Sequence, residues 1–320
     1  MALVAVTGGA GYIGANICKV LTEKGYEVRV IDDFSSGLES RLSGVKLEIA
    51  RGNILDRAFL EQALQGVHSV IHLAAKKSVE ESVQFPMKYY ENNIVGSLNL
   101  IAAMLSHGIK KIIFSSTAVV YSSTQGRPLS EDDPKEALSP YAHSKLLFEE
   151  LLAELGEAEE VSSVSLRYFN VVGAGGSFLG DNARDNLVPK VFAALTSGSS
   201  PEIYGTDYPT HDGTCIRDYV HVTDLAEAHI RALEFAESRR VSETFNVGSG
   251  RGYSVKEVLD QIKKSTGFNF EARESERRSG DPVQLLADIS KIARLLDWRP
   301  RSTLQEMIDS AWEADQAMRS

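Results

Sequence analysis

A tyrosine and a lysine stand one helical turn apart in the stretch SPYAHSKLLFEE, which covers residues 139–150. In a helix, Tyr141 and Lys145 lie about 40° apart around the axis and therefore share one face. A free tyrosine keeps its proton up to a pH near ~10, which is too high for a base at neutral pH. A nearby ammonium stabilises the phenolate, so the pair is a candidate acid/base that accepts and returns a hydroxyl proton.

A glycine-rich stretch, TGGAGYIGAN at 7–16, follows an apolar run and opens a helical pattern. Two spacings, G-x-G-x-x-G and G-x-x-G-x-x-G, are formed by Gly8, Gly9, Gly11 and Gly14. Such glycines let the backbone turn tightly and approach a pyrophosphate at a helix N-terminus. Asp32, which is preferred to Asp33 at the end of the next apolar run, can accept hydrogen bonds from the adenosine ribose. The sequence therefore predicts NAD, whose oxidised nicotinamide would add positive charge beside Tyr141.

Apolar runs and helical patterns alternate through the first half of the chain. Runs that predict strands cover 3–7, 26–32, 45–50, 69–74, 110–116 and 164–170, and helical patterns cover 15–24, 87–107 and 141–155. Several runs are apolar on both faces, which is typical of a parallel sheet covered by helices on both sides. The order predicts an α/β fold with a doubly wound parallel sheet, the Rossmann arrangement. The end of the fifth run places Thr117 at the predicted cofactor edge. There it can hydrogen-bond the same substrate hydroxyl whose proton Tyr141 would accept.

Loops rich in Gly, Asn, Asp and Pro dominate beyond the first half, and helices return later. Ser254 and Glu257 form a capping box for one of them. We expect an NAD-binding Rossmann domain over 1–170. We expect a smaller C-terminal α/β lobe over 171–320 that mainly binds substrate, with some segments returning to the first domain and a cleft between the two.

Composition excludes several other classes. The 320 residues carry a formal net charge of −10, which disfavours binding to nucleic acid or anionic membranes. The first apolar run lacks a basic flank and a cleavage site, and no run reaches the ~18 apolar residues of a membrane span. Cys18 and Cys215 are far apart and indicate a reduced, cytoplasmic protein. The histidines show no metal-binding spacing, so we expect no metal site and interpret His72 as a core residue.

The chain resembles the extended short-chain dehydrogenase/reductases and, among them, the UDP-glucose/UDP-galactose 4-epimerases. The resemblance runs in order over nearly the whole sequence. Its motifs are TGGAGYIG, the Asp32 strand end, GNI, VIHLAA, YYENN, FSSTAVVY, YAHSK, LRYFN, DNLVP, DYPTHDGTCIRDYVHV, FNVG and RRSGDP. The most specific of them are DYPTHDGTCIRDYVHV and LRYFN.

The resemblance implies a role for each matching position. Catalysis would involve Tyr141, Lys145 and Thr117. NAD would be bound by Gly8, Gly11, Tyr12, Ile13, Gly14, Asp32, Asn53, Ile54, Leu73, Ala74, Ala75, Lys77, Asn93, Ser115, Tyr141, Lys145 and Tyr168. The UDP-sugar would be bound by Lys77, Thr117, Tyr141, Asn170, Asn186, Leu187, Tyr204, Arg217, Arg278 and Asp281. The arginines would hold the diphosphate, because a guanidinium donates to two oxygens at once.

The reaction implied by the resemblance is reversible inversion at C4 of a UDP-hexose. Tyr141 would take the O4 proton while hydride passes from C4 to NAD, and the 4-keto sugar would then take the hydride back on its other face. Related dehydratases and decarboxylases carry acidic residues after the strand-end threonine, where this chain has Ala118 and Val119. A homodimer is expected by analogy with the superfamily.

Substrate choice stays open in the sequence. Asn53 stands where the family often has aspartate, Thr117 where serine is common, and the loop 173–186 matches the family poorly. Leu285 occupies a position associated with tolerance for a 2-N-acetyl group and is intermediate in size. UDP-GlcNAc/GalNAc and UDP-glucuronate are therefore alternative substrates. A non-catalytic NAD-sensing protein is the alternative of another class, although both Tyr141 and Lys145 are present.

Overall fold

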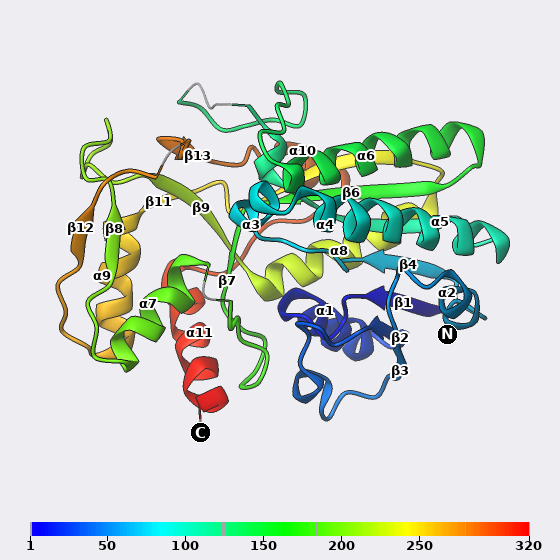
Figure 1. Ribbon diagram of the computed structural model, residues 1–320, viewed down its shortest axis with the longest axis horizontal. Helices are drawn as coiled ribbons and strands as arrows, with labels where there is room; N and C mark the ends of the chain where they lie inside the picture. Colours follow the sequence, from blue (N-terminus) through cyan, green and yellow to red (C-terminus); the bar gives the residue numbers. More distant parts are fainter. Residues whose placement is uncertain (1, 123–125, 184, 279, 320) are drawn as a thin grey trace.

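The computed structural model describes residues 2–122, 126–183, 185–278 and 280–319 (Figure 1). Its helices are α1 Tyr12–Glu23, α2 Arg57–Ala63, α3 Val79–Gln84, α4 Pro86–Tyr90, α5 Gly96–Ser106, α6 Pro140–Ala158, α7 Leu187–Thr196, α8 Val222–Ser238, α9 Val255–Thr266, α10 Ser290–Leu295 and α11 Leu304–Arg319. Its strands are β1 Leu3–Thr7, β2 Glu27–Asp32, β3 Glu48–Arg51, β4 Ser69–His72, β5 Lys111–Thr117, β6 Ser162–Tyr168, β7 Asn170–Val172, β8 Glu202–Tyr204, β9 Ile216–His221, β10 Ser242–Val247, β11 Gly252–Ser254, β12 Arg273–Ser275 and β13 Gln284–Leu285.

Seven strands of the described residues form one parallel sheet in the order β10-β6-β5-β4-β1-β2-β3. Successive side chains of each strand enter opposite cores because the strand period is two. Val4 and Val6 pack in the core that contains α1 and α8. Ala5 between them packs in the core that contains α2, α5 and α6. The prediction of a doubly wound parallel sheet with helices on both faces is confirmed.

Two element predictions need correction, and two elements were not predicted. The helix expected over 87–107 is α4, a π-helical turn at Glu91–Val95 and then α5. The strand expected over 164–170 is wrong at its end, because the chain leaves the large sheet after Tyr168 and enters a second sheet as β7. Sequence reasoning also missed α8 and β10, which come from the second half of the chain and complete the first sheet and its helical layer.

The rest of the second half forms a smaller α/β lobe, at the left of Figure 1. In the described part of this lobe, β7, β11 and β13 all pair with β9, and β8 pairs with β12. Helices α7, α9 and α11 pack around a core of their own that contains Phe192, Ile262 and Ile308. The capping box of Ser254 and Glu257 is confirmed at the start of α9. None of the helices in the described ranges is long and apolar enough to cross a membrane.

Candidate functional site

The glycine loop joins β1 to α1, at the carboxyl ends of the parallel strands where open α/β sheets bind ligands. Gly8 has a φ of +69°, a backbone region that favours glycine. A Cβ on Gly14 would lie 2.3 Å from the Gly8 carbonyl oxygen, so only glycine lets the helix start this close to the loop. The loop therefore brings backbone N–H groups and a helix N-terminus to one edge of the sheet.

Asp32 ends β2 and faces this loop, as the sequence predicted. Its carboxylate accepts hydrogen bonds from the backbone N–H of Ala10 (2.9 Å) and of Phe34 (2.8 Å). Burial raises the pKa of Asp32, and these two hydrogen bonds oppose that rise. Each carboxylate oxygen keeps further acceptor capacity. The group is thus fixed in orientation and still able to bind hydroxyls.

A cavity of about 490 Å³ runs along this edge. It is lined by every residue predicted to bind the cofactor except Asn93. Asn93 lies behind the wall, where its side chain accepts from the N–H of Lys76 (2.8 Å) and donates to Ser144 (3.1 Å). It therefore positions the wall of the cavity. The lining residues that sequence reasoning missed include Arg41, Asp181 and Asn182, which lie in irregular segments with no recognisable pattern.

Tyr141 and Lys145 project from the first turns of α6, which is capped by the Ser139 hydroxyl and has Pro140 at its first position. Lys145 is 4% exposed, and its Nζ donates to the carbonyl oxygen of Ser115 (2.8 Å). Burial lowers the pKa of Lys145 to about 7. The pair predicted from a four-residue spacing is therefore held against the end of β5.

The hydroxyl of Thr117 forms a hydrogen bond with the phenol of Tyr141. Burial raises the pKa of the Tyr141 phenol, and a hydrogen bond with Thr117 opposes this rise. The expectation from sequence was that the Lys145 ammonium would have this effect. That effect of Lys145 stays a prediction, and Thr117 is the last residue of β5 and lines the same cavity as Tyr141.

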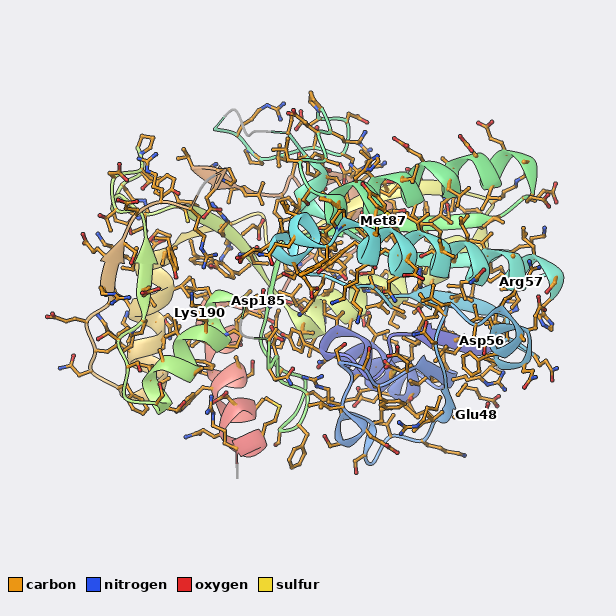
Figure 2. All side chains as sticks on the ribbon, in the orientation of Figure 1. Glu48, Asp56, Arg57, Met87, Asp185 and Lys190 are labelled. Atoms are coloured by element: carbon orange, nitrogen blue, oxygen red, sulfur yellow. The ribbon has the colours of Figure 1, made fainter. Side chains whose placement is uncertain are left out.

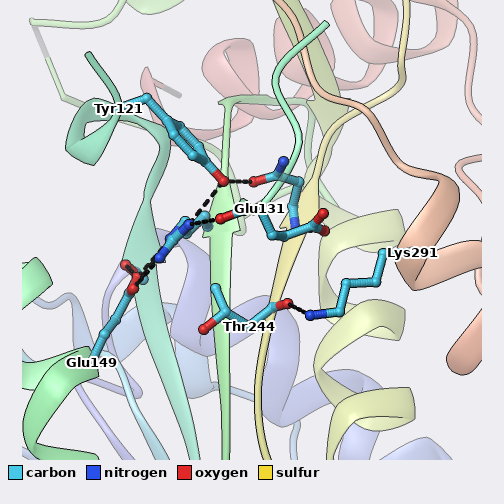
Figure 3. A network of polar contacts seen from close by, with 8 residues as sticks. Tyr121, Glu131, Glu149, Thr244 and Lys291 are labelled. Atoms are coloured by element: carbon cyan, nitrogen blue, oxygen red, sulfur yellow. Dashed lines mark hydrogen bonds and ion pairs between the residues drawn. The ribbon is translucent and has the colours of Figure 1, made fainter. Parts of the chain in front are cut away.

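Behind the pair, a buried ionic network fixes α6 to the sheet (Figure 3). Glu149, one turn after Lys145, accepts from Arg167 of β6 (3.0 Å) and from the Ser116 hydroxyl of β5. The same guanidinium donates to the Tyr121 hydroxyl (3.0 Å), which donates to Asn246 of β10 (2.6 Å). Three strands and the helix that carries Tyr141 therefore share one set of polar contacts.

A second cavity of about 490 Å³ lies between the large sheet and the smaller lobe. It is lined by every residue predicted for the UDP-sugar: Lys77, Thr117, Tyr141, Asn170, Asn186, Leu187, Tyr204, Arg217, Arg278 and Asp281. Asp185 and Lys190, labelled in Figure 2, line it as well, close to α7. Leu285 pairs with Arg217 in the second sheet and does not itself line this cavity.

Two arginines, Arg217 and Arg278, line this second cavity although the chain as a whole is acidic. Arg217 donates to the carboxylate of Asp281 (2.7 Å), which holds its guanidinium in place. The Arg278 guanidinium lies 4.2 Å from the centre of the Tyr204 ring. Such a combination of a stacked and an anchored arginine can hold a diphosphate beside an aromatic wall.

The two cavities meet at Tyr141. Both are lined by Tyr12, Ile13, Lys77, Tyr141 and Tyr168. The Tyr141 phenol on this shared wall faces both cavities. It can exchange a proton with a ligand in the second cavity, next to a dinucleotide in the first. This arrangement suits oxidation and reduction of an alcohol next to a dinucleotide.

Other candidate groups are structural. His72 is buried between the hydroxyls of Thr7 (2.7 Å) and Ser97 (2.8 Å), and burial lowers its pKa to about 3. This confirms its interpretation as a core residue. Over the residues that the structure describes, no group of three or more His, Cys, Asp or Glu side chains is arranged to hold a metal ion.

Comparisons with known proteins agree with this geometry. The model of the NAD dependent epimerase/dehydratase family matches residues 4–248. The UDP-glucose 4-epimerase of Halalkalibacterium halodurans is 41% identical over 317 residues, which cover 97% of this chain and 94% of that protein. A crystal structure of UDP-glucose-4-epimerase from Stenotrophomonas maltophila with bound NAD and formylated UDP-arabinopyranose has a TM-score of 0.96 and 36% identity, covering 100% and 99% of the two chains.

A UDP-Glc/GlcNAc 4-epimerase from Campylobacter jejuni is also similar, with a TM-score of 0.87, 36% identity and full coverage of both chains (100% each). The family model covers most of the sequence, and the similarity to the curated relative extends over nearly all of it. The chain therefore belongs to the NAD dependent epimerase/dehydratase family.

Proposed function

We infer that this protein is an NAD-dependent UDP-sugar 4-epimerase that interconverts UDP-galactose and UDP-glucose. The observation that carries this inference is Tyr141, which lies on the wall shared by the cavity at the glycine loop and the arginine-lined cavity. The first cavity fits NAD, because its glycine loop leaves no room for a Cβ and the Asp32 carboxylate retains acceptor capacity. When bound, NAD would supply the hydride acceptor and donor for the sugar, and it would be regenerated in each turnover.

The chain's own residues would handle the proton and hold the sugar. Tyr141 takes the O4 proton and returns it, and the Thr117 hydroxyl positions that oxygen and the phenol. Arg217 and Arg278 hold the diphosphate while the 4-keto hexose turns over between them and Tyr141. Ala118 and Val119 stand where related dehydratases and decarboxylases have acidic residues, so this chain has no group there to drive elimination.

We assign the binding roles on the same basis. The residues around the glycine loop and Asp32 would bind NAD, and those between Asn170 and Asp281 that line the second cavity would bind the UDP-sugar. We propose two functional units, 1–170 and 171–320. Support comes from the separate core of the second unit, from which α8 and β10 depart to join the first.

The function is tested by adding UDP-galactose to the purified protein without NAD and following UDP-glucose by anion-exchange chromatography. Conversion is expected, since the protein would carry NAD through purification. UDP-GalNAc and UDP-glucuronate are assayed in parallel, and the similarity to the Campylobacter jejuni enzyme makes the N-acetylated sugar a second candidate substrate. An absence of turnover with any of them, even after NAD is added, would contradict the proposal.

We also propose a homodimer located in the cytoplasm. Met87, Val95 and Leu98 are exposed along α4, the π-helical turn and α5, and Leu147 is exposed on the neighbouring α6. Met87, which is labelled in Figure 2, lies on α4. A second copy of the chain would cover these apolar side chains. The buried free thiols of Cys18 and Cys215 fit a reducing compartment.

A further inference from the structure

Residues 173–183, here termed the strap, lie across the start of α1 beside the cofactor cavity. The Tyr12 hydroxyl donates to the Gly173 carbonyl oxygen (2.6 Å). The Asn16 side chain accepts from the N–H of Gly175 (2.8 Å) and donates to the carbonyl oxygen of Leu179 (3.0 Å). A Cβ on Gly175 would lie 2.5 Å from the Asn16 oxygen, so the strap fits closely against the helix. In Figure 1 this green segment follows β7 and reaches the blue α1.

Arg41 forms hydrogen bonds with the far end of the strap, at Gly180 and Asn182. It belongs to a short 3-10 turn between β2 and β3 and is only 3% exposed. Its Nη2 donates to the carbonyl oxygen of Gly180 (2.9 Å) and to the side-chain oxygen of Asn182 (2.9 Å). Arg41, Asp181 and Asn182 all line the cofactor cavity. The contact therefore joins two loops that border the cavity.

The hydrogen bonding of Arg41 is incomplete within the described residues. Its Nε is buried and has no hydrogen-bond partner, while the nearby carboxylates of Asp181 and Asp32 interact with the guanidinium electrostatically. Burial of a guanidinium N–H without an acceptor is costly. A buried cation with a free donor at a cavity wall suits an anionic ligand, which a dinucleotide is.

We propose that Arg41 fastens the strap over the cofactor cavity and that this fastening controls how slowly NAD leaves the protein. The inference rests on the proposed function. Release of NAD requires the strap to open at Arg41, whereas the UDP-sugar enters the second cavity and exchanges without passing this contact. The device keeps the cofactor in place while substrate and product are exchanged at each turnover.

The test compares Arg41→Met with Arg51→Met. Methionine keeps much of the side-chain length and removes the donors. Arg51 is the matched control, because it is exposed, bonds Glu39 and stacks on Phe34 at the same sheet edge without lining the cavity. NAD per chain is measured after purification, and the release rate is measured by chasing bound NAD with excess fluorescent etheno-NAD. Asn182→Ala is a second variant, which removes the acceptor on the strap and keeps the arginine.

We expect release about tenfold or more faster for Arg41→Met, a change of about 1.4 kcal/mol in the barrier, with a smaller increase for Asn182→Ala and none for Arg51→Met. The double variant Arg41→Met/Asn182→Ala should release NAD no faster than Arg41→Met alone. Wild-type release rates in both the Arg41 and Asn182 variants would overturn the inference and leave the epimerase assignment intact. A wild-type protein that neither carries nor binds NAD would overturn both. If Arg41→Met does not fold, Asn182→Ala decides by the same criterion.

Discussion

The proposed chemistry depends on one phenol whose environment works against its ionisation. Tyr141 is buried, and burial raises its pKa, while the hydroxyl of Thr117 opposes that rise. Lys145 is held on the Ser115 carbonyl, at the end of the same strand. We infer that Thr117 lowers the pKa of Tyr141 and that Lys145 positions groups on the cofactor side of the pocket.

Tyr141→Phe should abolish most of the turnover, because it removes the group that takes and returns the O4 proton. We expect kcat to fall by roughly 10²–10⁴-fold, the range typical of a lost general acid/base. Turnover is measured with UDP-galactose after NAD per chain has been quantified. Tyr90→Phe, which removes a hydroxyl bonded to His143 outside both cavities, should leave kcat near the wild-type value. Equal turnover in Tyr141→Phe and wild type would refute the role.

Thr117→Val should move the pH dependence of the reaction. The Thr117 hydrogen bond lowers the pKa of Tyr141, so its removal raises that pKa. The limb of the kcat/KM profile that reports ionisation of the tyrosine is then displaced to higher pH. Thr117→Ser keeps the hydroxyl and should restore the wild-type profile. A valine variant whose profile keeps its wild-type position would show that the hydroxyl does not adjust Tyr141.

At the scale of elements, α6 carries the catalytic pair and the Glu149–Arg167 ion pair fixes it to the sheet (Figure 3). The sequence predicted most of this helix, because its cap, its proline and its apolar spacing are local signals. The ion pair was not predictable in the same way. No local pattern marks Glu149 as buried, and only the packing of β6 against β5 brings Arg167 to it.

Removal of one member of this ion pair should lower the unfolding free energy more than removal of both members. Glu149→Leu alone leaves the Arg167 guanidinium buried and unpaired, which typically costs about 3–5 kcal/mol of unfolding free energy. The double variant with Arg167→Met leaves no unpaired charge and should recover much of that loss. Urea unfolding of the two single variants and the double variant measures the coupling. Additive losses in the double variant would mean that the pair does not act as a unit.

At the scale of the whole molecule, the site forms where the carboxyl ends of the large sheet face the smaller lobe. The sheet, its glycine loop and Asp32 follow from local patterns, so they were predictable. The sequence also indicated that some later segments return to the first domain, but it did not identify α8 and β10 as those segments, although Val222, Leu225 and Leu233 have helical spacing. The strap could not be predicted either, because its position depends on contacts with α1 and Arg41 that lie more than a hundred residues away in sequence.

The exposed apolar side chains of α4, α5 and α6 lead to a prediction about assembly. Leu98→Glu places a charge in the proposed dimer interface, and burial of an unpaired charge is unfavourable. The variant should elute as a monomer in size-exclusion chromatography with light scattering, while wild type elutes as a dimer. Phe268→Glu alters an exposed apolar residue of the other lobe and should remain a dimer. A dimeric Leu98→Glu protein would place the interface elsewhere.

The central claim is that the hydrogen on C4 leaves the sugar as hydride and returns to the same carbon. It is tested most directly with UDP-galactose that carries deuterium at C4, incubated with the protein in ordinary water. We predict UDP-glucose that retains the deuterium at C4, as measured by mass spectrometry and NMR. Replacement of the deuterium by hydrogen from water would contradict the claim, since it would indicate removal of a C4 proton to solvent instead of transfer within the closed site.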